Sequence, residues 1–383
     1  MSKYNEWKIV KLGDVCNITM GQSPESSTYN SEGNGIPFYQ GNADFGILYP
    51  NTRLYCSKPE KLAYSNDILM SVRAPVGALN ISESTCCIGR GLSAIAAIED
   101  LTYYKYIYYN LIFQNKFIQS LGVGSTFKAI SGKVIYNLQV PLPSLSTQRQ
   151  IATTLDKASE LISLRKKQLE ELDKLAESVF FDMFGDPVKN ERGWEKDAII
   201  KYTECIVPGR DKPKSFTGNI PWITTAELNH LGFTYNSDKG LTENEIKLVK
   251  AKVIPRNSVI ITCVGDLGVV SIAANDMVIN QQLHAFICKE KVNNIYISFC
   301  LSKTKSYMYK MASSTTVPYM NKSICNSIPV IIPPLPLQQH FAAIIEKIEQ
   351  QKAEVRKALK ESEDLFQKLM RDLLNPQSGK MEV

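Results

Sequence analysis

The residues of this 383-residue chain whose chemistry stands out are polar and basic side chains that occupy matching places in its two halves. At a constant shift of 191 residues, Arg73 aligns with Val264 and Arg90 aligns with Gln281, which Gln282 follows. Arginine, glutamine and asparagine carry hydrogen-bonding groups that match the donors and acceptors on base edges. If the two halves are copies of one binding unit, a difference in what they bind should arise at positions where the backbone arrangement is the same but the side chain differs.

Other polar residues complete this candidate set. A polar pair follows each Ile-Pro run: Gln and Asn follow the run that begins at residue 36, and two Thr follow the run that begins at residue 220. Two Ser/Thr loops each precede a lysine that could bind a phosphate. Each candidate also has a plain structural interpretation. Arg90 would brace a turn between glycines, and Gln281 and Gln282 would satisfy buried backbone groups. The further candidates are Gln40, Asn42, Ser125, Thr126, Lys128, Thr224, Thr225, Thr315, Thr316 and Lys322.

The residue types needed for catalysis and metal binding are sparse. Nine cysteines without a C-x-x-C spacing, and three isolated histidines, argue against a disulfide framework and a zinc site. Neither a phosphate-binding loop nor a Gly-rich cofactor loop occurs, and Pro333-Pro334 lacks the flanking residues of an adenine-methylation motif. We therefore expect no catalytic residues, no metal and no cofactor in this chain.

Charge and hydropathy bound the environment of the protein. The net charge of +6 falls on the globular segments: +2 over residues 1–145 and +6 over 188–335, against −2 over 146–187 and 0 over 336–383. This distribution suits globular parts that contact a polyanion and helices that contact each other. The sequence has neither a run of about 18 apolar residues nor a signal-peptide region, so we expect a cytoplasmic protein without a membrane partner.

Both halves consist of a globular block followed by a long heptad-patterned segment. Residues 66–95 align without gaps on residues 257–286. Short apolar runs bounded by Gly, Pro and Asn predict strands, whereas residues 101–121 and 295–311 each have the spacing of one helix. We expect the tyrosines of residues 101–121 to pack on a sheet rather than stack on bases. The predicted fold is α+β, with two mixed α/β domains in tandem, each followed by a long helix.

The long segments carry a narrow apolar seam at alternating steps of four and three. Because a globular block lies between them, we expect the two helices to pair as an antiparallel coiled coil. Polar residues at three seam positions, Arg165, Lys352 and Ser362, would fix the register at some cost in stability. The apolar seam positions are Ile151, Leu155, Ala158, Ile162, Leu169, Leu172, Ala176, Val179, Met183, Phe341, Ile345, Ile348, Val355, Leu359, Phe366, Leu369 and Leu373.

Capping and stop residues define the predicted boundaries. Thr147 and Gln150 have capping-box spacing, and Gly185 and Asn375 lie in the two stop signals. The predicted order is a first domain at 1–145, a helix at 146–187, a second domain at 188–335, a helix at 336–376 and a tail at 377–383. At 1.5 Å per residue, helices of about 38 residues would be roughly 57 Å long and would act as a ruler.

The order of these motifs resembles the specificity subunits of type I restriction–modification systems. The resemblance rests on residues 66–69 (NDIL), 73–77 (RAPVG) and 89–92 (GRGL), and on the Pro-Leu/Gln entry into each helix. It covers essentially the whole chain, as two target-recognition domains, each followed by a helix. The family usually has Glu-Gln at the helix entry, where this chain has Thr147-Gln148 and Leu337-Gln338.

The resemblance implies a non-catalytic subunit that reads a bipartite, asymmetric site in double-stranded DNA, one half-site per domain. It implies two methyltransferase subunits, which make N6-methyladenine, and two restriction subunits. S-adenosylmethionine, ATP and Mg would belong to those partners. The alternatives are a stand-alone bipartite DNA-binding protein or orphan subunit serving another effector, an enzyme with an unrecognised site, and a structural spacer.

Overall fold

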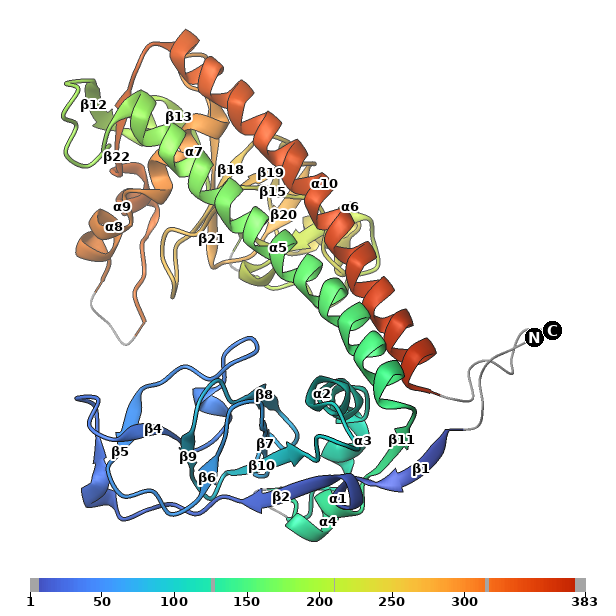
Figure 1. The fold of residues 1–383 in the computed structure, drawn as a ribbon. Coiled ribbons are helices and arrows are strands. Elements are labelled where there is room, and N and C mark those ends of the chain that lie inside the picture. The colour runs from blue at the N-terminus through green and yellow to red at the C-terminus, as the bar shows by residue number, and fades with distance from the viewer. Residues whose placement is uncertain (1–6, 125–127, 210, 314–316, 376–383) are drawn as a thin grey trace. The chain divides into compact units, whose positions relative to one another are not determined.

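A computed structural model describes residues 7–124, 128–209, 211–313 and 317–375 (Figure 1). The chain divides into two compact units, of which unit 1 comprises residues 1–166 and 358–383 and unit 2 comprises residues 167–357. Each unit holds one globular block, the start of one long helix and the end of the other. The predicted domain boundaries follow the globular blocks, whereas the division into units runs through both helices.

Two sheets form the globular block of unit 1. The four-stranded antiparallel sheet has the order β2 (Cys16–Met20), β10 (Leu92–Ala97), β7 (Ile68–Ser71), β8 (Leu79–Ile81). The five-stranded mixed sheet has the order β3 (Tyr29–Asn30), β5 (Leu54–Cys56), β4 (Ile36–Tyr39), β9 (Cys86–Ile88), β6 (Leu62–Ala63). Strand β1 (Lys8–Lys11) pairs with β11 (Gln139–Leu142) beside the start of the long helix. Every residue of β7 is buried, as its continuous apolar run predicts.

Unit 2 repeats this plan. Its first sheet has the order β13 (Thr203–Ile206), β21 (Leu283–Cys288), β18 (Val259–Thr262), β19 (Val270–Ala273), β15 (Phe233–Thr234). The second has the order β16 (Gly240–Leu241), β14 (Ile220–Ile223), β20 (Met277–Ile279), β17 (Val253–Ile254), and β12 (Glu195–Ala198) pairs with β22 (Pro329–Ile332). The pairs Leu92–Ser71 and Leu283–Thr262 occupy the same register. The repeat in the sequence is therefore a repeat of the fold, and the predicted α+β class is confirmed.

Short helices cover the sheets, and here the sequence-based prediction needs a correction. The segment at 101–121 forms two helices, α2 (Tyr104–Phe113) and α3 (Asn115–Ser120), and the segment at 295–311 also forms two, α7 (Asn294–Ser302) and α8 (Lys305–Met311). The break at Gln114 is held by its side chain, whose Nε2 donates to the carbonyl of Gln139 at 2.9 Å. The other short α-helices of the described residues are α1 (Leu12–Val15), α4 (Gly132–Tyr136), α6 (Glu243–Leu248) and α9 (Lys322–Asn326).

The tyrosines of α2 pack as predicted. Tyr106, Tyr108 and Tyr109 belong to the apolar core of unit 1. The hydroxyl group of the fully buried Tyr106 donates to the carbonyl of Pro141 at 2.7 Å, which joins α2 to β11. In unit 2, Tyr296 of α7 makes the same bond to Ile331 of β22 at 2.7 Å. These tyrosines join each short helix to its sheet and are not available for stacking.

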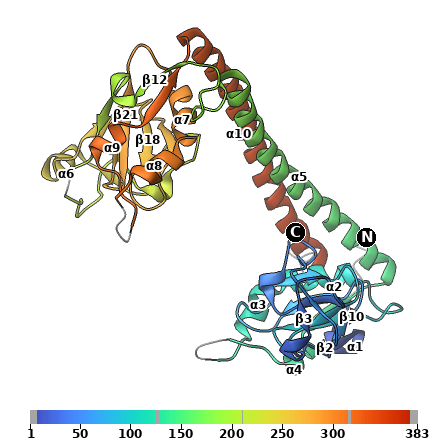
Figure 2. The same ribbon diagram turned by 90° about the vertical axis from the view of Figure 1, so that its left-hand side faces the viewer.

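The two long helices, α5 (Leu145–Phe184) and α10 (Leu335–Leu374), are each 40 residues long without interruption. In unit 1, Leu155 near the start of α5 shares a core with Met370 near the end of α10. In unit 2, Phe184 at the end of α5 shares a core with Phe341 near the start of α10, and α7 lies beside that start (Figure 2). The helices therefore pair in antiparallel fashion, as predicted.

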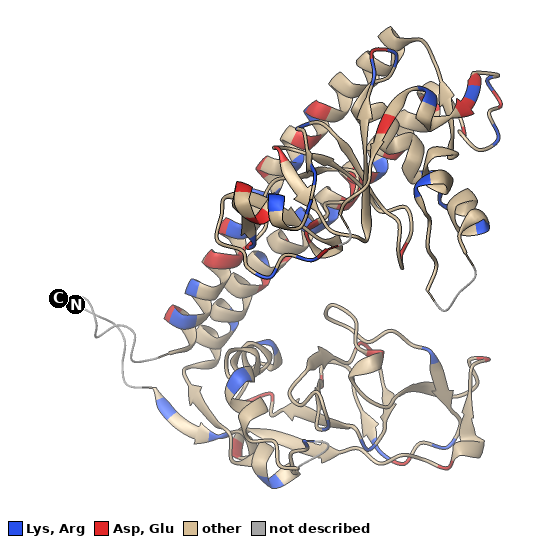
Figure 3. Ribbon diagram, turned by 180° about the vertical axis from the view of Figure 1, so that it is seen from behind, with Lys and Arg blue, Asp and Glu red and all other residues tan. Residues whose placement is uncertain are grey.

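All seam positions predicted from the heptads are buried or half-buried, whereas off-seam residues of both helices are largely exposed. Basic and acidic residues intermingle on the exposed faces (Figure 3). Of the polar seam residues, Lys352 is paired across the seam, with its Nζ 2.7 Å from Asp173. The hydroxyl group of Ser362 donates a hydrogen bond to the carbonyl of Ala358, one turn earlier in the same helix, at 2.8 Å. Within the described residues, no helix is long and apolar enough to cross a membrane.

A buried glutamine joins each long helix to its globular block, and the two copies use the same atoms. The Oε1 of Gln148 accepts the N–H of Tyr103 at 2.9 Å, and its Nε2 donates to the carbonyls of Leu101 and Pro143, both at 3.0 Å. Gln338 accepts from Asn293 at 2.9 Å and donates to Lys291 at 3.3 Å and Pro333 at 2.8 Å. The cap of α5 is Ser144, whose Oγ accepts the N–H of Thr147 at 3.2 Å, so the predicted cap at Thr147 is wrong by one turn.

Candidate nucleic-acid interface

Four of the residues singled out in the first half of the sequence line one pocket of unit 1. Gln40 and Asn42 follow β4, Arg73 follows β7, and Arg90 precedes β10. Together with Ser23 and the small residues Gly41, Ala74 and Gly91, they surround a pocket of about 180 Å³. The side chains of Gln40, Arg73 and Arg90 are exposed. The fold therefore gathers side chains that lie up to 50 positions apart in the sequence.

The backbone around this pocket is held by hydrogen bonds. Buried Asp44 accepts the N–H of Gln40 on its Oδ2 at 2.7 Å, while Arg53 pairs with the Oδ1 of the same carboxylate. The N–H of Val72 donates to the carbonyl of Gly91 at 2.9 Å. A Cβ atom at Gly91 would lie 2.2 Å from the carbonyl oxygen of Gln40, so only glycine permits this close approach of the two loops. The polar side chains thus extend from loops whose backbone is held by hydrogen bonds and close packing.

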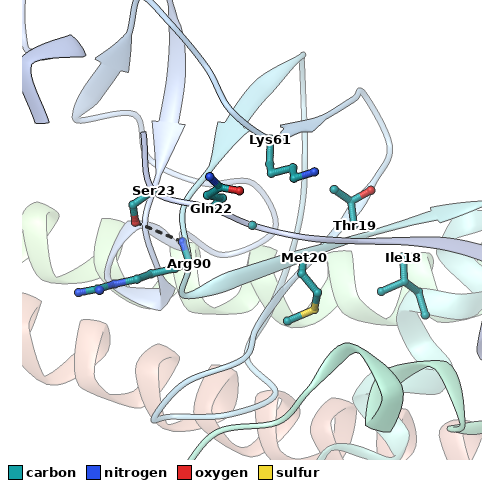
Figure 4. Close-up of a pocket in the computed structure, with 8 residues that line it drawn as sticks. Ile18, Thr19, Met20, Gln22, Ser23, Lys61 and Arg90 are labelled. Atoms are coloured by element: carbon teal, nitrogen blue, oxygen red, sulfur yellow. Dashed lines mark hydrogen bonds between the residues drawn. The ribbon is translucent and has the colours of Figure 1, made fainter. Parts of the chain in front are cut away.

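A second, larger hollow of about 690 Å³ adjoins the pocket and shares Ser23 and Arg90 with it. Figure 4 shows the Ser23 hydroxyl bonded to the backbone N–H of Arg90, at 3.4 Å, while the Arg90 side chain extends away from Met20 and Ile18. Lys61 also lines this hollow. The sequence analysis did not single out Ser23 or Lys61. The Gly/Ser/Asn-rich composition of residues 21–35 was the available signal for Ser23, and none marked Lys61.

The corresponding place in unit 2 has different chemistry. Thr224 follows β14, and its N–H and hydroxyl both donate to Glu227, at 2.8 and 2.6 Å. Burial acts to raise the pKa of Glu227, but the bonds from Thr224 outweigh it and hold the pKa below its usual value. Thr225 is half-buried and begins the short helix that Thr224 caps. The threonine pair therefore shapes this loop, as Asp44 shapes the loop in unit 1.

The two glutamines of unit 2 differ in their freedom to contact a ligand. The Nε2 of Gln281 donates to the carbonyls of Gly209 and Asp211, each at 3.2 Å, which supports the structural interpretation of that residue. Gln282 is exposed, and its Oε1 accepts a bond from Asn280 at 3.1 Å. Gln282 remains the better candidate for an external contact.

Of the hydroxyl loops, Ser125, Thr126, Thr315 and Thr316 lie outside the described residues. Lys128 is exposed and adjoins Ala129, whose backbone pairs with that of Arg73. Lys322, by contrast, is the exposed first residue of α9. Lys128 therefore lies next to the residue that pairs with Arg73. At the equivalent place in unit 2, the backbone of Val264 pairs with that of Tyr319, three residues before Lys322.

A cysteine–histidine pair in unit 2 has the separation of a catalytic pair but not its environment. The Nδ1 of His284 lies 3.1 Å from the Sγ of Cys325, and both residues are buried. Burial raises the pKa of the Cys325 thiol, and burial together with Lys322 lowers the pKa of His284 to about 4. At neutral pH both groups are uncharged, whereas a nucleophilic cysteine needs its thiolate form. Within the described residues no group of three or more His, Cys, Asp or Glu side chains could hold a metal ion.

Comparison with known proteins places these features in a family. The model of the type I restriction modification DNA specificity domain matches residues 4–174 and again residues 203–362. The chain is 43% identical over 176 residues to the type I restriction enzyme MjaX specificity subunit of Methanocaldococcus jannaschii, an alignment that covers 45% of this chain and 41% of that relative. It is 25% identical over 386 residues to the MjaIX specificity subunit of the same organism, covering 90% of this chain and 87% of that protein.

Solved structures agree on the fold. The crystal structure of the type I restriction–modification system S subunit from M. genitalium matches with a TM-score of 0.64 at 15% identity, covering 98% of this chain and 97% of that one. A chain from a structural study of complex assembly and conformational transition of the type I R-M system matches with a TM-score of 0.59 at 16% identity, covering 96% and 97%. With two matches to the family model that together span most of its length, the chain belongs to the type I restriction–modification DNA specificity family, which confirms the resemblance seen in its sequence.

Proposed function

We propose that the protein is the DNA-reading subunit of a type I restriction–modification complex, in which each globular block reads one half of a split, asymmetric site. The observation that carries this proposal is the repeat of one fold with unlike polar side chains at corresponding loops. Arg73 and Arg90 of unit 1 stand where unit 2 has Val264 and Gln281. Two readers of one design with different side chains would select two different half-sites.

The remaining parts of the complex are those that the family of this chain implies. In this proposal the chain is not an enzyme; it recruits two methyltransferase subunits and, for restriction, two restriction subunits in the cytoplasm. The methyltransferase subunits bind S-adenosylmethionine, and the restriction subunits use ATP and Mg. The uncharged, buried His284 and Cys325 support a non-catalytic role, because neither is accessible to a substrate.

The two long helices would set the number of unread base pairs between the half-sites. Both are continuous over 40 residues, and a heptad inserted at matching places in both would keep the seam in register while adding about 10 Å. At 3.4 Å per base pair this corresponds to about three base pairs. Lengthening of the spacer with both half-sites unchanged is the expected result. An unchanged spacer in a stable, active insertion variant would refute the ruler role.

The direct test is a genome-wide map of N6-methyladenine in cells that carry this gene and its methyltransferase, against cells that lack only this gene. We expect one asymmetric split motif to lose methylation when the gene is deleted. An unchanged map, with the methyltransferase expressed and active, would instead favour the stand-alone DNA-binding protein. A purified chain that binds one bipartite sequence tightly without any methyltransferase would point the same way.

A further inference from the structure

The pocket of unit 1 lined by Gln40, Asn42, Arg73 and Arg90, here called the arginine pocket, has two arginines and no acidic residue in its lining. Within the described residues, neither guanidinium makes a hydrogen bond or an ion pair. The nearby carboxylate of Asp44 is already occupied, because Arg53 and the N–H of Gln40 bond to it. Like charges that share a small pocket repel each other. The arrangement thus favours a ligand that offers hydrogen-bond acceptors to both arginines.

Two parts of DNA present paired acceptors to an arginine. A phosphate offers two oxygens, and guanine offers O6 and N7 side by side in the major groove. The amides of Gln40 and Asn42 decide between them, because an amide carries an acceptor as well as donors. A phosphate oxygen cannot satisfy the amide oxygen, whereas a base pair presents donors and acceptors together. The mixed lining therefore matches a base edge better than a phosphate.

On this basis, and given the proposed function, we propose that Arg73 and Arg90 read guanine, so that the half-site of unit 1 contains at least one required G·C pair. The corresponding positions of unit 2 are Val264, which has no polar group, and Gln281, whose amide holds the loop at Gly209 and Asp211. Unit 2 reads its half-site without this arginine pair. The chemical asymmetry of the two pockets is thus expected to appear as an asymmetry of base composition at these positions.

The frame of the arginine pocket strengthens this assignment. Arg90 adjoins Gly91, whose missing side chain lets its loop lie against the Gln40 carbonyl. The backbone N–H of Arg90 bonds to Ser23, and the backbone of Arg73 pairs with Ala129. Both arginines therefore project from anchored backbone, which is the condition for telling one base from another rather than only attracting DNA.

The first test maps N6-methyladenine in cells in which the full chain, with its methyltransferase, carries Arg90→Gln or Arg73→Gln. We expect one half-site to lose its requirement for a guanine, with discrimination falling roughly 5- to 150-fold, and the other half-site to stay intact. Lys58→Gln, which removes an exposed charge elsewhere in unit 1, should leave the motif unchanged. A variant that lowers methylation uniformly at an unchanged motif would identify a phosphate contact and overturn guanine reading.

A second test uses the unmodified complex and so does not depend on a variant that folds. Each guanine of a target duplex is replaced in turn by 7-deazaguanine, which lacks the N7 acceptor, and the affinity of the chain–methyltransferase complex is measured. We expect a loss of roughly 5- to 150-fold at a guanine of one half-site only. No loss at any guanine would overturn the proposal. Absence of any sequence-specific methylation by the complex of the unmodified chain with its methyltransferase would instead refute the proposed function itself.

Discussion

Gln148 and Gln338 provide the sharpest test of how each long helix is fixed to its globular block. Both side chains are almost completely buried, at 1% and 0% exposure. Gln148→Leu keeps the approximate volume of the side chain but removes all three of its hydrogen bonds. The N–H of Tyr103 and the buried carbonyl of Pro143 then lose these bonds, whereas the carbonyl of exposed Leu101 is better placed to bind water.

The size of the effect follows from the two groups left without this partner. Each buried, unsatisfied backbone group costs about 1–3 kcal/mol, and the apolar leucine recovers roughly 1 kcal/mol by its own burial. We therefore expect Gln148→Leu to lower the free energy of unfolding of unit 1 by about 1–5 kcal/mol. For a unit of this size this corresponds to a fall in melting temperature of roughly 2–20 °C. Gln338→Leu should have the same effect on unit 2, through Asn293 and Pro333.

The assay is thermal and urea denaturation of the full chain, with hydrogen exchange to assign each transition to a unit. Gln150→Leu and Gln339→Leu are matched controls, because these residues lie on the same helices and are exposed. We expect each control to change the stability by less than about 0.5 kcal/mol. If Gln148→Leu destabilised the chain no more than Gln150→Leu, the buried glutamine would not be what fixes the helix to its block.

Two further predictions concern the helix seam and the pH dependence of stability. Leu155→Ala should lower the free energy of unfolding by about 2–5 kcal/mol, because the side chain is fully buried. Leu161, which is 39% exposed, is the control, and Leu161→Ala should lower it far less. Equal losses in urea titrations would contradict the assignment of Leu155 to the buried seam. The pKa of His284 is about 4 in the folded chain against an ordinary value of 6.5, so its contribution to stability is complete above pH 6.5 and is lost as the pH falls toward 4. Between pH 7.5 and pH 5, the wild type should therefore lose about 2 kcal/mol more of its unfolding free energy than His284→Gln. Parallel pH profiles of the two proteins would show that His284 does not cause the loss of stability at low pH.

Several residues of the candidate site could be identified from the sequence, but the sequence did not show that they lie together. Aligning the two halves identified Arg73 and Arg90 as positions where the plan is kept and the side chain changes. Nothing in the linear order indicated that they share a pocket with Gln40 and Asn42, because β4, β7 and β10 meet only through sheet pairing and loop contacts. Lys61 was missed for the same reason, since no motif surrounds it.

Interpretations that the sequence left open were decided by hydrogen bonds between distant residues. Gln281 was a candidate base reader, yet its amide donates to carbonyls about 70 positions earlier in the chain. The helix expected at residues 101–121 is broken at Gln114, where a side chain bonds to β11. Helical spacing continues through that break, because periodicity records which face is apolar and not where the backbone turns.

Features that depend on local periodicity and on repetition could be predicted from the sequence alone. The heptads defined the seam of α5 and α10, because a buried helical stripe needs apolar residues at fixed steps, and the shift of 191 residues defined two copies of one fold. Which polar groups meet became visible only in the folded chain. Examples are the arginine pocket, the buried amides of Gln148 and Gln338, and the pairing of Lys352 with Asp173. The physical reason is that apolar burial depends on a pattern along the chain, whereas a hydrogen bond depends on the position of two atoms that folding alone brings together.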